Sequence, residues 1–249
     1  METVAVERSG SVATISFGSG ERFNALGLAD WRALERAATA LAGDRSLRAV
    51  VLRGRGGVFC SGSDMREWQD ASGADVSHSF KLLEEALQAI EDLPVPTVAV
   101  VEGVATGAGC QLALACDLQL MNGSARIGMP IARLGLLVPA TFANRMSLRI
   151  GPSRTKDLLY GGRLLTAERA GAIGLVSTVV PDDGADAALA GLLAGWDRLS
   201  AASLRASKAA VDQGLRPLTQ PARHLAPGPA ADPHEFAGRV HRFLHRKRL

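Results

Sequence analysis

Two glycine-bearing stretches say most about the fold: FCSGSD at residues 59–64 and GVATGAGCQ at residues 103–111. Each follows an apolar run, at residues 49–52 and 97–101, of the kind that forms a buried strand. Each also stands where a helix would begin, and the first N–H groups of a helix have no partner within it and favour negative charge. Two such turns facing one another would point two amide donors at one oxygen, as in an oxyanion hole.

The second stretch lacks the features of nucleotide-binding loops. Gly107 and Gly109 fit the start of a Gly-x-Gly-x-x-Gly fingerprint, but Leu112 takes the third glycine position. No suitably placed acidic residue follows about twenty positions on, where that fingerprint needs one. The Gly-Lys-Ser/Thr ending of a phosphate loop is also missing. The sequence therefore argues against nucleotide binding of either kind.

The two stretches belong to a longer series of short motifs. The series comprises residues 24–26 (NAL), 59–64, 103–111, 116–117 (CD), 166–170 (TAERA), 174–176 (GLV) and 243–248 (FLHRKR). In order and content it resembles the crotonase superfamily, the enoyl-CoA hydratase/isomerase family, with Glu102 and Ala108 replacing the usual Asn and middle Gly. The resemblance implies an α/β fold: a crotonase-like spiral of ββα units followed by a C-terminal helical oligomerisation region.

The same resemblance implies a site for an acyl thioester of CoA or of a carrier protein. The two backbone amides that would hold the thioester carbonyl fall on Ser63 and Ala108, and contacts to the CoA moiety fall on Ser61, Ser63, Phe243 and Arg246. CoA would be part of the substrate, so no separate cofactor and no metal are expected. The chain would assemble as a homotrimer or a hexamer, with Phe243 and Arg246 reaching a neighbouring subunit's CoA.

Two residues set this chain apart from hydratases of the family. Those enzymes use two glutamates, which fall here on Gln111 and Ile131. Glutamine does not usefully accept a proton and isoleucine has no polar atom, while each positioned acid–base group contributes about 10²–10⁴ in rate. We therefore expect little hydration or double-bond migration. Decarboxylation of a malonyl-type thioester, which needs mainly enolate stabilisation, or a degenerate acyl-CoA-binding protein are the alternatives.

Other titratable residues could replace the missing glutamates. Glu84 is the first candidate and His78 the second, and His234 could swing in. Lys81 and Glu85 are spaced i, i+4, which favours an ion pair on the solvent side of a helix. Asp64, with Glu67 three residues later, predicts a capping box, which makes Asp64 a structural residue.

Composition limits the remaining possibilities. The chain has 249 residues, of which 47% are hydrophobic, and a net charge of +3. The hydrophobic content predicts a sizeable core. The net charge is too small to argue for nucleic-acid binding. Three cysteines cannot all pair, and neither a leader peptide nor a membrane span is apparent, so a cytoplasmic protein is expected. His241 and His245, also i, i+4, are either metal ligands or simply solvated.

The pattern of elements changes near residue 184. Residues 1–183 alternate strands, turns and helices, as a ββα core containing the thioester site would. Residues 184–249 lose the strand signals and become Ala-rich, which predicts a C-terminal helical region. Five prolines between residues 217 and 233 predict an irregular loop there. A last helix is expected from about His234.

Overall fold

A computed structural model describes residues 3–224 and 229–245. Its larger sheet has six strands in the order β1-β2-β3-β4-β6-β9, in which only β1 and β2 pair antiparallel. These strands are β1 Val4–Ser9, β2 Val12–Phe17, β3 Ala49–Gly54, β4 Thr97–Val101, β6 Leu118–Asn122 and β9 Thr178–Val180. The smaller sheet has the order β5-β7-β8, formed by β5 Val104–Thr106, β7 Arg126–Gly128 and β8 Leu164–Thr166.

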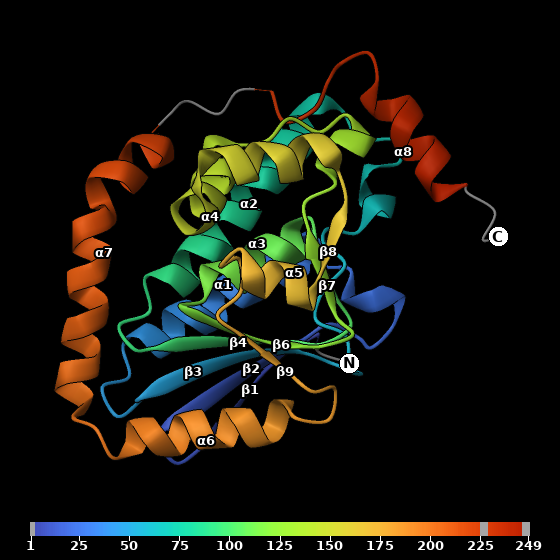
Figure 1. The fold of residues 1–249 in the computed structure, drawn as a ribbon. Helices are drawn as coiled ribbons and strands as arrows, with labels where there is room; N and C mark the ends of the chain where they lie inside the picture. The colour runs from blue at the N-terminus through green and yellow to red at the C-terminus, as the bar shows by residue number, and fades with distance from the viewer. Residues whose placement is uncertain (1–2, 225–228, 246–249) are drawn as a thin grey trace.

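Helices cover both faces of the larger sheet (Figure 1). They are α1 Leu28–Ala42, α2 Gly73–Glu91, α3 Ala108–Ala115, α4 Ala140–Gly161, α5 Ala167–Ala172, α6 Ala185–Asp197, α7 Ala201–His224 and α8 Phe236–Leu244. Helix α6 packs on one face, where Ala185 meets Val51 and Val100, and the main core lies on the other. Strands β3 and β4 are therefore mostly apolar, in residues 49–52 and 98–101, because both of their faces are buried there. The predicted α/β fold is confirmed, as two mixed sheets with C-terminal helices.

The first hairpin follows its sequence pattern. Ala13, Ile15 and Phe17 on β2 are completely buried, while the residues between them are only half-buried. Helix α1 presents Trp31, Leu34, Ala38 and Leu41 to the core and ends at Gly43. Apolar residues at every second position thus predict strand β2 correctly, and apolar residues spaced three or four positions apart predict helix α1 correctly.

The irregular loop predicted from residue 217 is wrong for its first part. Helix α7 continues through Pro217 and Pro221 to His224. Asn144 of α4 donates a hydrogen bond of 2.8 Å to the Leu218 carbonyl, and Lys208 donates to Asp117 at 3.0 Å, so α7 is tied to the body on both sides of Pro217. Tertiary contact of this kind overrides helix propensity. Helix α8 begins at Phe236, close to the predicted start.

Helix α4 contains a kink. It begins at Ala140 and is kinked at Gly151, which has φ 77° and precedes Pro152. The kink is the kind that proline causes within a helix. Within the described ranges, no helix is long and apolar enough to cross a bilayer.

Candidate active site

The structure brings the two glycine-bearing turns side by side. Cys60 donates its N–H to the Val104 carbonyl at 2.9 Å and accepts at its own carbonyl from Thr106 at 3.0 Å. The approach is so close that a Cβ on Gly109 would lie 2.1 Å from the Cys60 oxygen. A Cβ on Gly62, whose φ is 101°, would lie 2.8 Å from the Thr106 oxygen. Glycine is therefore required where the turns meet.

The amides of Ser63 and Ala108 lie on either side of this contact. Leu26 exchanges hydrogen bonds with the residues before and after Ser63, at 2.8 and 2.9 Å, so the Ser63 N–H points away from Leu26. Ala108 is the first residue of α3, and Gly107 before it adopts φ 58°, ψ −122°. Across residues 3–224 and 229–245, neither amide donates a hydrogen bond to the protein. Two donors are thus available at neighbouring turns.

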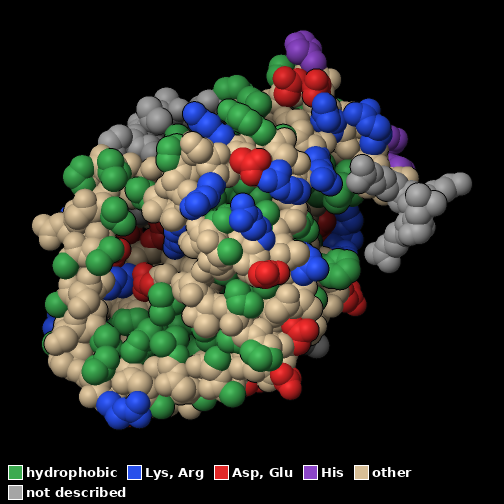
Figure 2. Space-filling view, viewed as in Figure 1, with side chains coloured by type: hydrophobic (Ala, Val, Ile, Leu, Met, Phe, Trp, Pro, Cys, Tyr) green, Lys and Arg blue, Asp and Glu red, His purple; other side chains and the backbone are tan. Residues whose placement is uncertain are grey.

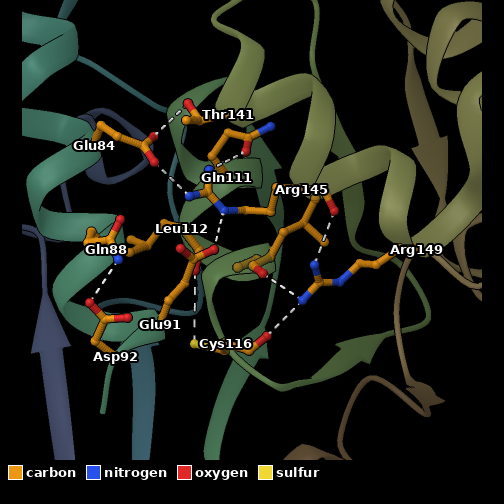
Figure 3. A network of polar contacts seen from close by, with 12 residues as sticks. Glu84, Gln88, Glu91, Asp92, Gln111, Leu112, Cys116, Thr141, Arg145 and Arg149 are labelled. Atoms are coloured by element: carbon orange, nitrogen blue, oxygen red, sulfur yellow. Dashed lines mark hydrogen bonds and ion pairs between the residues drawn. The ribbon is translucent and has the colours of Figure 1, made fainter. Parts of the chain in front are cut away.

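Gln111 lies completely buried, three residues after Ala108 on the same helix. Its Oε1 accepts a hydrogen bond of 3.0 Å from Nη1 of Arg145, a buried residue of α4 (Figure 3). Its Nε2 lies 3.8 Å from the Met129 sulfur. Ile131, where the resemblance leads us to expect the second glutamate position, is also buried and begins the 3₁₀ turn Ile131–Leu134.

Arg145 joins Gln111 to two carboxylates of α2. Its Nη2 donates to Glu84 at 3.0 Å and its Nε to Glu91 at 2.6 Å. Thr141 donates to the second oxygen of Glu84 at 3.1 Å. Burial works against the positive charge, but Glu91 and Glu84 outweigh it and raise the pKa of Arg145. We call Gln111, Arg145, Glu84, Glu91 and Thr141 the arginine network.

All members of the arginine network except Gln111 line a cleft of about 1040 Å³ between α7 and the body of the molecule. Figure 2 shows this cleft as a hollow beside α7, with charged side chains inside it. Arg149 lines the cleft as well and donates to the carbonyls of Leu114 and Cys116, at 2.6 and 3.0 Å. Glu84 and Glu91 thus lie between this cleft and the buried Gln111.

The remaining titratable candidates lie apart from Gln111. Lys81 and Glu85 form the predicted exposed pair, with 3.9 Å between Nζ and Oε1. His78 and His234 are exposed. Of the sequence candidates among the described residues, only Glu84 is joined, through Arg145, to Gln111. Arg145, Glu91 and Thr141 were not predicted; the seven-residue spacing of Glu84 and Glu91, which places both on one face of α2, was the available signal.

The predicted capping box at Asp64 is only half correct. Asp64 accepts a hydrogen bond from the Arg66 N–H at 3.1 Å and caps the 3₁₀ turn Met65–Trp68, and Arg22 lies 2.7 Å from its carboxylate. Burial raises the pKa of the Asp64 carboxyl against the opposing effect of Arg22. Glu67 instead accepts from the Leu28 N–H at 3.0 Å, because the start of α1 packs against this turn.

The residues expected to contact CoA are only partly covered by the structure. Ser61 donates its hydroxyl to the Arg22 carbonyl at 3.1 Å. Phe243 is about half exposed on α8, and Arg246 lies outside the described residues. The His241 and His245 rings stack with centroids 4.1 Å apart. No group of three or more potential metal ligands occurs within the part of the chain that the structure describes.

Comparison with known proteins places the chain in a family. The model of the enoyl-CoA hydratase/isomerase family matches residues 7–227. The chain is 32% identical to the probable enoyl-CoA hydratase echA8 of Mycobacterium bovis, covering 86% of the chain and 82% of that protein. It is 31% identical to the mitochondrial methylglutaconyl-CoA hydratase of Homo sapiens over 73% of the chain, which spans only 55% of the human protein.

Solved structures agree with the sequence matches. An enoyl-CoA hydratase/isomerase from Xanthobacter autotrophicus Py2 superposes with a TM-score of 0.84 at 26% identity, covering 98% of the chain and 94% of that structure. An enoyl-CoA hydratase/carnithine racemase from Magnetospirillum magneticum gives 0.83 at 28% identity, covering 99% and 89%. The chain belongs to the enoyl-CoA hydratase/isomerase (crotonase) family.

Proposed function

We propose that this protein acts on a CoA or carrier-protein acyl thioester, holding the thioester carbonyl with the Ser63 and Ala108 amides. The observation that carries the proposal is the pair of unpaired N–H groups at two touching turns. Fixed donors aimed at an oxygen stabilise the negative charge of an enolate, and one such donor is worth about 2.7–4 kcal/mol to the transition state. The names of the relatives, all acyl-CoA enzymes, support the substrate class.

Ordinary hydration is not part of this proposal. Gln111 is buried with its oxygen bound to Arg145, and Ile131 is buried without a polar atom. Neither can pass a proton between water and an α-carbon. Glu84 accepts hydrogen bonds from Arg145 and Thr141, and Arg145 links it to Gln111. A reaction that generates its own carbanion fits these residues better than one that needs two carboxylates.

Decarboxylation of a malonyl-type thioester is such a reaction. The bond to the carboxylate breaks, carbon dioxide leaves, and the electron pair passes into the enolate, which the two amides stabilise. The enolate then takes a proton from water. The non-catalytic alternative is an acyl-CoA-binding protein that uses the same amides without turnover.

Two incubations distinguish these possibilities. The purified protein is mixed with crotonyl-CoA, or with malonyl- and methylmalonyl-CoA, and products are followed by mass spectrometry. We expect negligible hydration of crotonyl-CoA. Release of carbon dioxide from a malonyl thioester would support the decarboxylase, and tight binding without products would support the binding protein. Crotonyl-CoA turnover of tens per second, typical of enzymes, would refute the assignment of Gln111 and Ile131.

Oligomeric state and CoA contacts extend the proposal. A homotrimer or hexamer would appear in light scattering at micromolar concentration, and a monomer would contradict it. Truncation after Ala237 removes most of α8, including Phe243, together with Arg246. It should weaken CoA binding in an intact oligomer, because arginine suits phosphate through its forked donors. A cytoplasmic location is part of the same proposal.

A further inference from the structure

The orientation of the Gln111 carboxamide is fixed by its neighbours. Arginine can only donate hydrogen bonds, so the atom facing Arg145 at 3.0 Å must be the oxygen of Gln111. The amide nitrogen is thereby turned toward the Met129 sulfur. Arg145 itself is held by Glu84 and Glu91, at 3.0 and 2.6 Å, so it cannot swing away at low cost.

The nitrogen of Gln111 is poorly satisfied in this orientation. It carries two N–H donors and is completely buried. Its acceptor among the described residues is the Met129 sulfur, 3.8 Å away. A thioether is a weak acceptor, and a buried donor without a good partner is costly. The amide therefore has donor capacity that the protein leaves unused.

Gln111 comes from the same face of α3 as Ala108 in the proposed thioester site. Gln111 follows Ala108 by three residues, so both are on one face of the helix. The Gly107 N–H donates to the Gly128 carbonyl at 3.0 Å, which brings the segment of Met129 and Ile131 against the start of α3. An acyl chain whose carbonyl is bound at Ala108 would run along this face, past the Gln111 nitrogen.

We infer that Arg145 is a positioning residue that locks Gln111 as a hydrogen-bond donor to an oxygen acceptor on the acyl chain. The inference rests on the proposed function and narrows its substrate class. The preferred thioester carries a carbonyl or carboxylate oxygen beyond the α-carbon, in contrast to a plain alkyl or enoyl chain. Ile131 offers that chain an apolar neighbour and no competing polar group.

The test compares two four-carbon thioesters by titration calorimetry with the full chain. Acetoacetyl-CoA, kept un-ionised at mildly acidic pH, carries a β-oxygen that only accepts, and butyryl-CoA lacks it. The wild type should bind acetoacetyl-CoA about fivefold more tightly, the net effect of one hydrogen bond. Gln111→Leu should abolish the preference. Gln111→Glu keeps a partner for Arg145 but replaces the donor by an acceptor, so the preference should reverse.

Arg145→Lys tests the positioning role. It keeps the charge between Glu84 and Glu91 but loses the fork that holds the Gln111 oxygen. The ratio of the two affinities, which a general loss of binding or of stability would leave unchanged, should fall toward unity. A wild type that binds both thioesters equally, or a Gln111→Leu variant that keeps the preference, overturns the inference alone. A wild type that binds neither overturns the proposed function with it.

Discussion

The paired turns at Ser63 and Ala108 differ from the arginine network in the part of the chain that they use. The turns use main-chain N–H groups, whereas the arginine network uses side chains. The turns present main-chain donors, so their side chains can vary as long as the backbone can approach closely. Ala108 accordingly stands in a position where the family usually has glycine and still begins a helix with its N–H free. The arginine network depends on side-chain identity, so a change of a single side chain, such as that of Gln111, would alter what the network can do.

The largest effect should follow from breaking the contact between the turns. In Gly109→Ala the new Cβ would meet the Cys60 carbonyl oxygen at 2.1 Å and the Cys60 Cβ at 2.8 Å. Overpacking of this severity should cost about 3 kcal/mol or more of unfolding free energy, measured by denaturant titration. Gly214→Ala is the matched control, since nothing lies within 4 Å of its Cβ on helix α7. It should be neutral or stabilising.

The second largest loss of stability is expected when Arg145, the cation of the arginine network, is replaced by an uncharged residue. Arg145→Met leaves Glu84 and Glu91 facing each other without their shared partner, and should cost about 3 kcal/mol in unfolding free energy. Adding Glu84→Gln and Glu91→Gln should recover much of this loss, because the uncompensated charges disappear. Lys81→Met, which breaks the exposed pair on the same helix, should change little. Equal losses of unfolding free energy in Arg145→Met and Lys81→Met would contradict the prediction that the buried ion pairs of Arg145 matter more than the exposed pair.

The sequence predicts these two regions unequally well. The strands, helices and turns around Ser63 and Ala108 follow from apolar runs and glycine positions, which are local signals. The arginine network joins α2, α3 and α4, and the residues to which the Arg145 side chain donates hydrogen bonds lie at least 34 residues away from it in the chain. No local pattern specifies such contacts. The helix through Pro217 was mispredicted for the same reason, since distant contacts such as that of Asn144 hold it.

Alkaline pH should weaken the paired turns in a graded way. Cys60 and Cys110 flank the contact between the turns, and burial raises the pKa of each thiol to about 12 from 9.0. The unfolded chain loses these protons first, so stability is full below about pH 9 and falls as pH rises toward 12. Each thiol contributes a slope of up to about 1.4 kcal/mol per pH unit. Unfolding free energies across this range should fall less steeply in Cys60→Ala/Cys110→Ala, and an equal slope would contradict the prediction.

The smallest effect on stability and on binding is expected when the Ser63 side chain is removed, because the proposal uses only the Ser63 backbone N–H. Ser63→Ala removes a hydroxyl but leaves the backbone N–H that the proposal uses, so unfolding free energy should change by no more than about 0.5 kcal/mol. The Kd for butyryl-CoA should likewise stay within about twofold, because no net hydrogen bond is lost. Ser61→Ala, by contrast, loses the hydroxyl bond to the Arg22 carbonyl and should destabilise the turn by up to about 1 kcal/mol. A tenfold loss of butyryl-CoA affinity in Ser63→Ala would mean that the hydroxyl, and not the amide, holds the thioester. This turn would then depend on side-chain identity, as the arginine network does.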